Sequence, residues 1–327
     1  MSDRHVHAWL LAMVRADCTP PGTALSPQEM ASLLELADRH GVLPQVLAGL
    51  DATSLSAADR AAIDAAKAGL RMRLGGCMLL RMQLRQIADE LLRQSLKAIV
   101  IKGATFADRL YADPSLRTFT DVDLLAPSDA FDGIHAAMLG LGYQTQKPAM
   151  KYADGYGEIS FSRPAAGGNV ELHWNVVNSP TLRRRVSVAY EDLQLLDGDQ
   201  RSAGLPAMSP ASMLLVAAVH GAASHGFDRL QLLVDVRQAV NGTAGPLDEG
   251  YLRSAIDRTG AGFALASALE LTDRLLGVPA CRELSGRLGL TRPAGLGLLL
   301  SRGVVLRCHA RRDSFRRQMF RSMLKKK

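Results

Sequence analysis

The strand-like segments of this sequence all lie in one stretch near the middle of the chain, and helical patterns occupy both sides of it. Apolar residues recur at helical spacing before this stretch, and the chain is again mostly helical after it. We therefore expect an α+β fold with three regions. An N-terminal helical region covers residues 1–95, a small sheet core covers 96–178, and a C-terminal helical domain covers 179–327 and ends in a basic tail at 302–327.

The N-terminal region contains two clear helical segments. Ser26 and Glu29 have the spacing of a capping box, which predicts a helix over about residues 27–40. A second segment runs over about residues 56–95, and the adjacent glycines Gly75 and Gly76 could break it in two.

Short β-branched or alternating runs define the central region. The expected strands are Ala98–Ile101, Thr118–Leu125, Tyr143–Gln146, Glu158–Ser162 and Asn169–Trp174. Helical stretches at Ala104–Tyr111 and Asp129–Leu141, the second capped by Ser128, separate the first three of these strands.

The positive charge of the chain is concentrated in its C-terminal tail. The formal net charge is +7, whereas Arg302–Lys327 holds ten Lys and Arg against one acid. Phe315, Met319, Phe320 and Met323 recur at helical spacing there. Such a tail can bind RNA phosphates, an acidic peptide or an anionic membrane. The alternative is a final helix that docks through this apolar stripe and leaves its basic face in solvent.

Cysteine usage and hydropathy indicate a cytoplasmic chain. The four cysteines, Cys18, Cys77, Cys281 and Cys308, have no CxxC spacing, which predicts reduced thiols and no zinc cluster. No run of about 18 uninterrupted apolar residues occurs, so no transmembrane segment is expected.

The most informative short motif is Asp121-Val122-Asp123. Residues i and i+2 of a strand share a face, so both carboxylates project together while Val122 points into the core. Two carboxylates on one face can hold a hard cation such as Mg²⁺, which also prefers phosphate oxygens. The motif therefore suits a site for a metal and a nucleoside triphosphate.

A third acid is available on a later strand. In Val170-Glu171-Leu172-His173-Trp174, Glu171 and His173 face away from the apolar residues. If this strand lies beside the aspartate pair, Glu171 completes a site with three carboxylates, which needs a cation to offset the repulsion of like charges. His173 is then either a residue that supports this site or a satisfied buried histidine.

Candidate phosphate-binding residues come before the aspartates. Lys102-Gly103-Ala104 lies where a strand turns into a helix, and Gly103 allows a phosphate to approach the backbone. Lys102 and Arg117 are candidate cations for the triphosphate. Arg117 could instead pair with a nearby acid.

The C-terminal region contributes weaker candidates. His220 and His225 lie five residues apart on an expected helix, so they diverge by about 140° and make a poor metal pair. His220 or Asp235 could approach a nucleotide or belong to the core. The sequence lacks GxxxxGK[ST] and GxSxG, which disfavours P-loop enzymes and serine hydrolases.

Taken together, these positions resemble the uncharacterised nucleotidyltransferase family within the polymerase-beta-like nucleotidyltransferase superfamily. The resemblance covers about residues 91–240. The residues that carry it are Ile101-Lys102-Gly103, Leu110-Tyr111, Asp113-Pro114, Arg117, Asp121-Val122-Asp123-Leu124-Leu125, Val170-Glu171-Leu172-His173-Trp174, His220, His225, Phe227 and Leu233-Val234-Asp235.

The resemblance implies a nucleotidyltransferase-type mixed sheet and an enzyme that moves a nucleoside monophosphate from a triphosphate to an acceptor, with release of pyrophosphate. It assigns Asp121 and Asp123 to Mg²⁺, or to Mn²⁺ in its place, and Glu171 to the third acid. The wider superfamily has Gly-Gly or Gly-Ser at the phosphate turn, whereas this chain has Gly103-Ala104 and lacks that hydroxyl. Lys102 is the candidate substitute.

The sequence does not distinguish between several classes of acceptor. A peptide or protein side chain, a small hydroxylated molecule and an RNA end all fit the same chemistry, and the basic tail Arg302–Lys327 favours a peptide or RNA. Two rival functions are a tRNA-modifying nucleotidyltransferase toxin and a catalytically silent nucleotide-binding scaffold.

Overall fold

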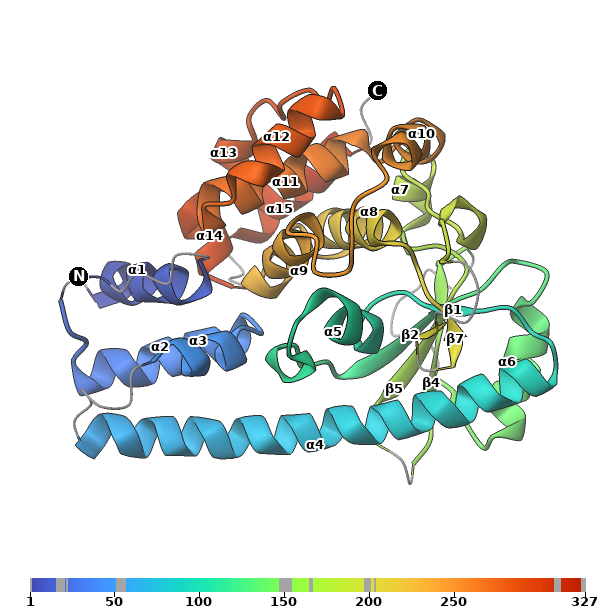
Figure 1. The fold of residues 1–327 in the computed structure, drawn as a ribbon, viewed down its shortest axis with the longest axis horizontal. Coiled ribbons are helices and arrows are strands. Elements are labelled where there is room, and N and C mark those ends of the chain that lie inside the picture. The colour runs from blue at the N-terminus through green and yellow to red at the C-terminus, as the bar shows by residue number, and fades with distance from the viewer. Residues whose placement is uncertain are drawn as a thin grey trace.

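The fold is described from a computed structural model (Figure 1). The description covers residues 2–15, 21, 23–50, 57–146, 155–164, 167–196, 201–202, 204–308 and 313–324. Cys18, Ala165 and Ala166, and the tail residues Arg311, Arg312 and 325–327 lie outside these residues.

Four helices form the N-terminal region: α1 (Ser2–Val14), α2 (Pro27–Arg39), α3 (Leu43–Gly49) and α4 (Ala57–Arg93). The capping box of α2 is confirmed, since the Ser26 hydroxyl accepts from the Glu29 amide and the Glu29 carboxylate accepts from the Ser26 amide. Helix α4 is continuous through Gly75 and Gly76, so the break considered above does not occur. A glycine inside a helix costs only about 1 kcal/mol, which the contacts of this long helix offset.

The central sheet has five strands in the order β1-β2-β5-β4-β3. They are β1 (Ile99–Val100), β2 (Asp121–Leu125), β3 (Gln144–Thr145), β4 (Glu158–Ser162) and β5 (Asn169–His173). Strands β2 and β5 are parallel, and the other neighbours are antiparallel. The expected α+β fold with a mixed sheet is therefore confirmed.

Helix α5 (Ala104–Leu110) follows β1, the 3₁₀ turn η2 (Pro114–Leu116) precedes β2, and α6 (Phe131–Gly140) connects β2 to β3. Ser128 does not cap α6, because the helix begins after Ala130 without a side-chain cap.

Most of the chain after β5 is helical. Its elements are α7 (Pro180–Arg183), η3 (Tyr190–Asp192), the short strands β6 (Arg201–Ser202) and β7 (Leu205–Pro206), α8 (Pro210–His220), the π-helical turn η4 (Gly221–His225), α9 (Leu230–Val240), α10 (Glu249–Thr259), α11 (Gly262–Leu276), α12 (Pro279–Arg287), α13 (Leu296–Leu299), α14 (Arg302–Leu306) and α15 (Ser314–Met323). Residues 210–219 of α8 are all buried, as expected for an apolar helix at the centre of a domain.

Two hydrophobic cores lie on opposite faces of the sheet. One packs Val122 and Leu124 of β2 against α6 and the C-terminal half of α4. The other joins the N-terminal helices, α5 and the C-terminal helices into one cluster. Helix α4 accordingly extends from the N-terminal helices at one end to the sheet at the other (Figure 1).

The last helix does not dock through the stripe that the sequence predicted. Phe320 is buried beside Phe227, whereas Phe315 and Met319 are exposed. The buried face also includes Arg317, whose guanidinium donates to the backbone oxygen of Val304 at 2.8 Å. Hydrogen bonds to backbone carbonyls let an arginine replace an apolar residue on this face.

Cys77, Cys281 and Cys308 are buried free thiols. Across the described residues, no helix has both the length and the apolar character needed to cross a bilayer.

Candidate active site

The parallel pairing of β2 with β5 brings the predicted acids together. Asp123 lies opposite Glu171 in this register. Because Val122 and Leu124 point into the core, the side chains of Asp121 and Asp123 project from the other face of the sheet, and the same alternation on β5 places Glu171 and His173 on that face.

Asp123 is fully buried and lies at the centre of the cluster. Its Oδ1 atom is 2.6 Å from Nζ of Lys102 and 3.2 Å from Nε2 of His173. Its Oδ2 atom is buried and has no hydrogen-bond partner among the described residues. Burial raises the pKa of this carboxyl, but Lys102 and the hydrogen bond from His173 outweigh burial and hold the pKa well below its usual range. Asp123 is thus a carboxylate with one free oxygen.

The backbone around Lys102 fixes its position. The amide of Ile101 donates to the backbone oxygen of Asp123 at 3.1 Å, which ties the end of β1 to β2. Gly103 has φ of +55°, and a Cβ atom there would lie 3.3 Å from the backbone oxygen of Asp121. Both facts favour glycine at this turn, which aims the Lys102 side chain at the acids.

His173 is buried among three carboxylates. Its Nε2 atom is 3.5 Å from Oε2 of Glu171, and its Nδ1 atom is 3.3 Å from Oε2 of Glu158. Burial disfavours a charged imidazole, but the hydrogen bonds to Asp123 and Glu171 outweigh burial and raise the pKa of His173 to about 9. At neutral pH this ring is a cation that connects β2, β4 and β5.

The possible ligand atoms of Asp123, Glu171 and His173 all lie within 4.8 Å of one another, close enough to hold one metal ion. A protonated imidazole has no lone pair to offer, so the two carboxylates are the ligands of this group while His173 is charged. Carboxylate oxygens are ligands that Mg²⁺ and Mn²⁺ accept, and the free Oδ2 of Asp123 supplies a lone pair for such an ion. The residues therefore fit a divalent cation. Asp121 is not a member of this three-residue group.

Asp121 faces the open side of the same cluster. Burial raises its pKa to about 6, and the negative charge of Asp123 adds to this effect, while Lys102 opposes it. The ionised carboxylates of Asp121 and Asp123 repel each other in this largely buried site, and a bound cation would relieve the repulsion.

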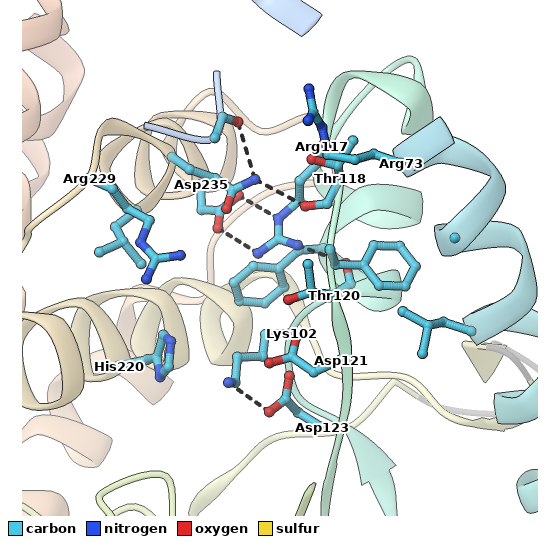
Figure 2. A pocket seen from close by; sticks show the side chains of 18 of the residues that line it. Arg73, Lys102, Arg117, Thr118, Thr120, Asp121, Asp123, His220, Arg229 and Asp235 are labelled. Carbon is cyan, nitrogen blue, oxygen red and sulfur yellow. Dashed lines mark hydrogen bonds and ion pairs between the residues drawn. The ribbon is translucent and has the colours of Figure 1, made fainter. Parts of the chain in front are cut away.

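A cavity of about 610 Å³ opens over Asp121, Asp123 and Lys102. Figure 2 shows these three side chains at one wall of the cavity, with His220 and Arg229 on another. The walls come from the sheet, from α2 and α4 of the N-terminal region, and from α8, η4 and α9. All three regions of the chain therefore contribute to one site.

A family model described as uncharacterised nucleotidyltransferase matches residues 26–277, which is more than half of the chain. The chain belongs to this uncharacterised nucleotidyltransferase family. The match extends beyond the 91–240 resemblance found above and includes α2, α4 and α11. Membership supports a transferase activity with a nucleoside triphosphate as substrate.

One solved structure similar to this nucleotidyltransferase family member is an antigenic nucleotidyltransferase-like protein from Paracoccidioides brasiliensis. The two share 15% identity with a TM-score of 0.34 over 66% of this chain and 94% of the other. No curated protein matches the sequence.

Arg117, which the sequence predicted as a cation for the triphosphate or as the partner of an acid, forms a buried ion pair with Asp235 of α9. Its Nε and Nη2 atoms donate to the two carboxylate oxygens of Asp235, each at 2.9 Å. The Tyr111 hydroxyl also donates to Asp235 at 2.7 Å, and Nη1 of Arg117 donates to the backbone oxygen of Gly103 at 3.1 Å. Arg117 and Asp235 line the cavity, but their polar groups are directed mainly at each other (Figure 2).

His220 and His225 lie closer together than the sequence predicted. Their ring centroids are 4.7 Å apart, because Gly221–His225 is a π-helical turn rather than a continuation of α8. A wider turn brings residues five apart onto one side, so the expected divergence was wrong. Burial lowers the pKa of His220 well below its usual value, which keeps this ring neutral in the cavity wall.

Sequence reasoning missed several residues of the cavity. Arg73 of α4 pairs with Asp38 of α2 at 2.6 Å, and Arg229 lies between Asp228 and His225. Both arginines line the cavity, Arg73 from α4 and Arg229 from the residue just before α9, and both are far from β2 in sequence. The extension of the family match to α2 and α4 is the signal that could have drawn attention to Arg73.

Proposed function

We propose that this protein is an Mg²⁺-dependent nucleotidyltransferase that transfers a nucleoside monophosphate from a nucleoside triphosphate to an acceptor hydroxyl and releases pyrophosphate. The observation that carries the proposal is the pairing of β2 with β5, which puts Glu171 opposite Asp123, next to a cavity that Asp121, Asp123 and Lys102 line and that is large enough for a nucleotide. A buried acidic cluster of this kind is costly without a cation.

The three acids share one proposed role, and the basic residues around them have others. Asp121, Asp123 and Glu171 hold Mg²⁺, or Mn²⁺ in its place, which when bound supplies charge stabilisation at the reacting phosphate. Lys102, with the backbone of Gly103 and Ala104, contacts the triphosphate. His173 holds the carboxylates of Asp123 and Glu171 in position through its contacts with both.

The transfer follows from this arrangement. The acceptor oxygen forms a bond to the α-phosphorus as the bond from that phosphorus to the oxygen bridging to the β-phosphate breaks. The electron pair of the broken bond leaves with pyrophosphate. The hydroxyl proton passes to the carboxylate of Glu171, which is partly exposed. The chain contributes mainly position and charge stabilisation.

Arg117, His220 and Asp235 act on the nucleotide indirectly in this proposal. The hydrogen bond from Arg117 to the backbone of Gly103 holds the phosphate turn, and Asp235 holds Arg117. Neutral His220 contributes shape and a hydrogen-bonding group to the wall without adding charge. The three buried free thiols fit a reducing compartment, and we assign the protein to the cytoplasm.

The test uses each of the four nucleoside triphosphates labelled at the α-phosphorus, incubated with Mg²⁺ and a lysate of the source organism. We expect label to move to a defined species, with pyrophosphate released in equal amount. Asp121→Ala/Asp123→Ala should reduce transfer by about a hundredfold or more. Asp129→Ala, which removes an exposed carboxylate outside the site, is the matched control.

Equal labelling by the wild type and the double variant would reject the site. Nucleotide binding without pyrophosphate release under any condition would instead favour the silent scaffold. Label that ribonuclease removes would favour a tRNA-modifying enzyme.

A further inference from the structure

One long helix carries a continuous apolar surface that the fold leaves uncovered. Side chains in the middle of α4 are exposed to fractions far above those of core residues: Met72 80%, Met78 67%, Leu79 56% and Met82 59%. Gly75 and Gly76 lie between them, and nothing would contact a Cβ atom at either position within 4 Å. We call these six residues the α4 surface. Contiguous exposed apolar residues of this kind mark interaction sites.

The α4 surface continues into the proposed active site. Gly76 and Leu79 belong both to this surface and to the wall of the cavity that holds Asp121. Figure 2 shows Arg73, on the same stretch of helix, at the edge of the cavity. A chain lying on this surface would therefore pass the mouth of the cavity.

Charge selects the kind of partner. Between Asp64 and Asp89 the helix has five basic residues and no acid. Arg73 and Arg81 pair with Asp38 and Asp108. Lys67, Arg71 and Arg85 have no ion-pair partner among the described residues. At about 100° per residue, Lys67 and Arg85 lie at the edge of the α4 surface away from Gly76 and the cavity, and Arg71 lies around the helix between Met78 and Met82.

A second copy of this chain fits the surface poorly, since two such helices would bring like charges together. RNA is disfavoured because the exposed side chains are methionine and leucine, with no aromatic ring on which a base could stack. The flexible methionine side chains, next to the space left by Gly75 and Gly76, can instead pack against apolar side chains of a polypeptide.

We propose that the α4 surface docks an acceptor polypeptide, through apolar side chains on the methionines and acidic side chains on Lys67, Arg71 and Arg85. This inference rests on the proposed function for the reaction, but the docking itself needs no nucleotide. The acceptor is then a hydroxyl of the docked polypeptide, which attacks the α-phosphorus with the bond changes given above.

The probe is a fluorescent 18-residue synthetic peptide with leucines at helical spacing, glutamates on its other face and one central serine. We expect the full-length protein to bind it, measured by fluorescence anisotropy without nucleotide. Met72→Gln/Met82→Gln should weaken binding about tenfold, and Arg71→Ala/Arg85→Ala should weaken it several-fold and reduce its salt dependence. Leu298→Gln removes an equally exposed apolar side chain elsewhere and should change nothing.

All these substitutions are at exposed positions, so equal thermal midpoints would show that each variant is folded. Binding that is absent, or equal in the wild type and Met72→Gln/Met82→Gln, would overturn the proposal. Preferential binding of a single-stranded RNA 20-mer or of vesicles containing phosphatidylserine, with the same sensitivity to Met72→Gln/Met82→Gln, would also overturn it.

A nucleotide-transfer assay on the bound peptide tests the docking proposal and the proposed function separately. With α-labelled nucleotides and Mg²⁺, the wild type should label the serine of the bound peptide. Peptide binding that depends on the α4 surface, with no label and no pyrophosphate from any acceptor, would reject the nucleotidyltransferase reaction and leave the docking surface established. Label on small hydroxyl compounds but never on the bound peptide would reject the polypeptide acceptor alone.

Discussion

The ammonium group of Lys102 lies 2.6 Å from the carboxylate of Asp123, and it provides positive charge where a divalent cation would also bind. Burial lowers the pKa of Lys102, but Asp123, Asp121 and Glu171 outweigh burial and raise it, so the amine stays charged. Lys102 therefore stabilises the acidic cluster when no metal is bound, and it would compete with a divalent cation for Asp123.

Lys102→Met should tighten the binding of Mn²⁺ in the absence of nucleotide. Removing a unit charge next to a buried carboxylate lowers the repulsion of an incoming cation by on the order of 1 kcal/mol, which corresponds to about fivefold or more in affinity. Electron paramagnetic resonance of free Mn²⁺ measures this directly, and the same variant should transfer nucleotide poorly. Lys97→Met, at an exposed position, is the control. Unchanged Mn²⁺ affinity in Lys102→Met would show that the amine does not compete with the metal.

Asp121→Asn should stabilise the metal-free protein at pH 7.5. The folded pKa of Asp121 is about 6, above the ordinary value of 3.8, so its stabilising contribution is complete below pH 3.8 and is lost as the pH rises through 6. An asparagine avoids the loss, and we expect a gain on the order of 2 kcal/mol in the free energy of unfolding. Urea denaturation in a chelator should show this gain at pH 7.5 and little difference near pH 4. A variant that is less stable at pH 7.5 would contradict the assigned repulsion.

His173→Gln should have the opposite dependence on pH. The folded pKa of His173 is about 9 against an ordinary value of 6.5, so its contribution is complete below pH 6.5 and is lost as the pH rises through 9. We expect the variant to lose on the order of 2–3 kcal/mol at pH 6 and less at pH 9.5. Denaturation in a chelator at the two pH values tests this, and imidazole resonances of the wild type should titrate near pH 9. Equal losses at both pH values would mean that packing, rather than charge, is the contribution of His173.

Arg117→Ala should destabilise the fold strongly. It leaves the carboxylate of Asp235 buried without its bidentate partner, which typically costs about 3–5 kcal/mol. Replacing both residues, as Arg117→Met/Asp235→Leu, should recover much of this loss. Arg282→Ala, which breaks an exposed pair with Asp273, should cost only about 0–1 kcal/mol in the same denaturation series. If Arg117→Ala instead weakens nucleotide binding with full stability, Arg117 is a direct phosphate ligand.

The sequence was sufficient for features that depend on local periodicity. Alternation of apolar and polar residues in β2 and β5 correctly predicted the strands and which side chains share a face. The capping box likewise predicted the start of α2, because its two hydrogen bonds involve residues three apart. The site residues themselves remain predictions until the variants above are measured.

Tertiary structure decided which of these faces meet and which charges pair. The parallel register that puts Asp123 opposite Glu171, and the pairing of Arg117 with Asp235 across 118 positions of sequence, depend on chain packing that no local pattern specifies. The π-helical turn that brings His220 beside His225 is likewise a departure from the helical period of the sequence. The sequence by itself therefore determined the strands, the start of α2 and the supply of acids, since these follow from neighbours along the chain. Only the packed fold decided how those acids and their counter-charges are arranged around the cavity, because burial and long-range pairing set their distances and their pKa values.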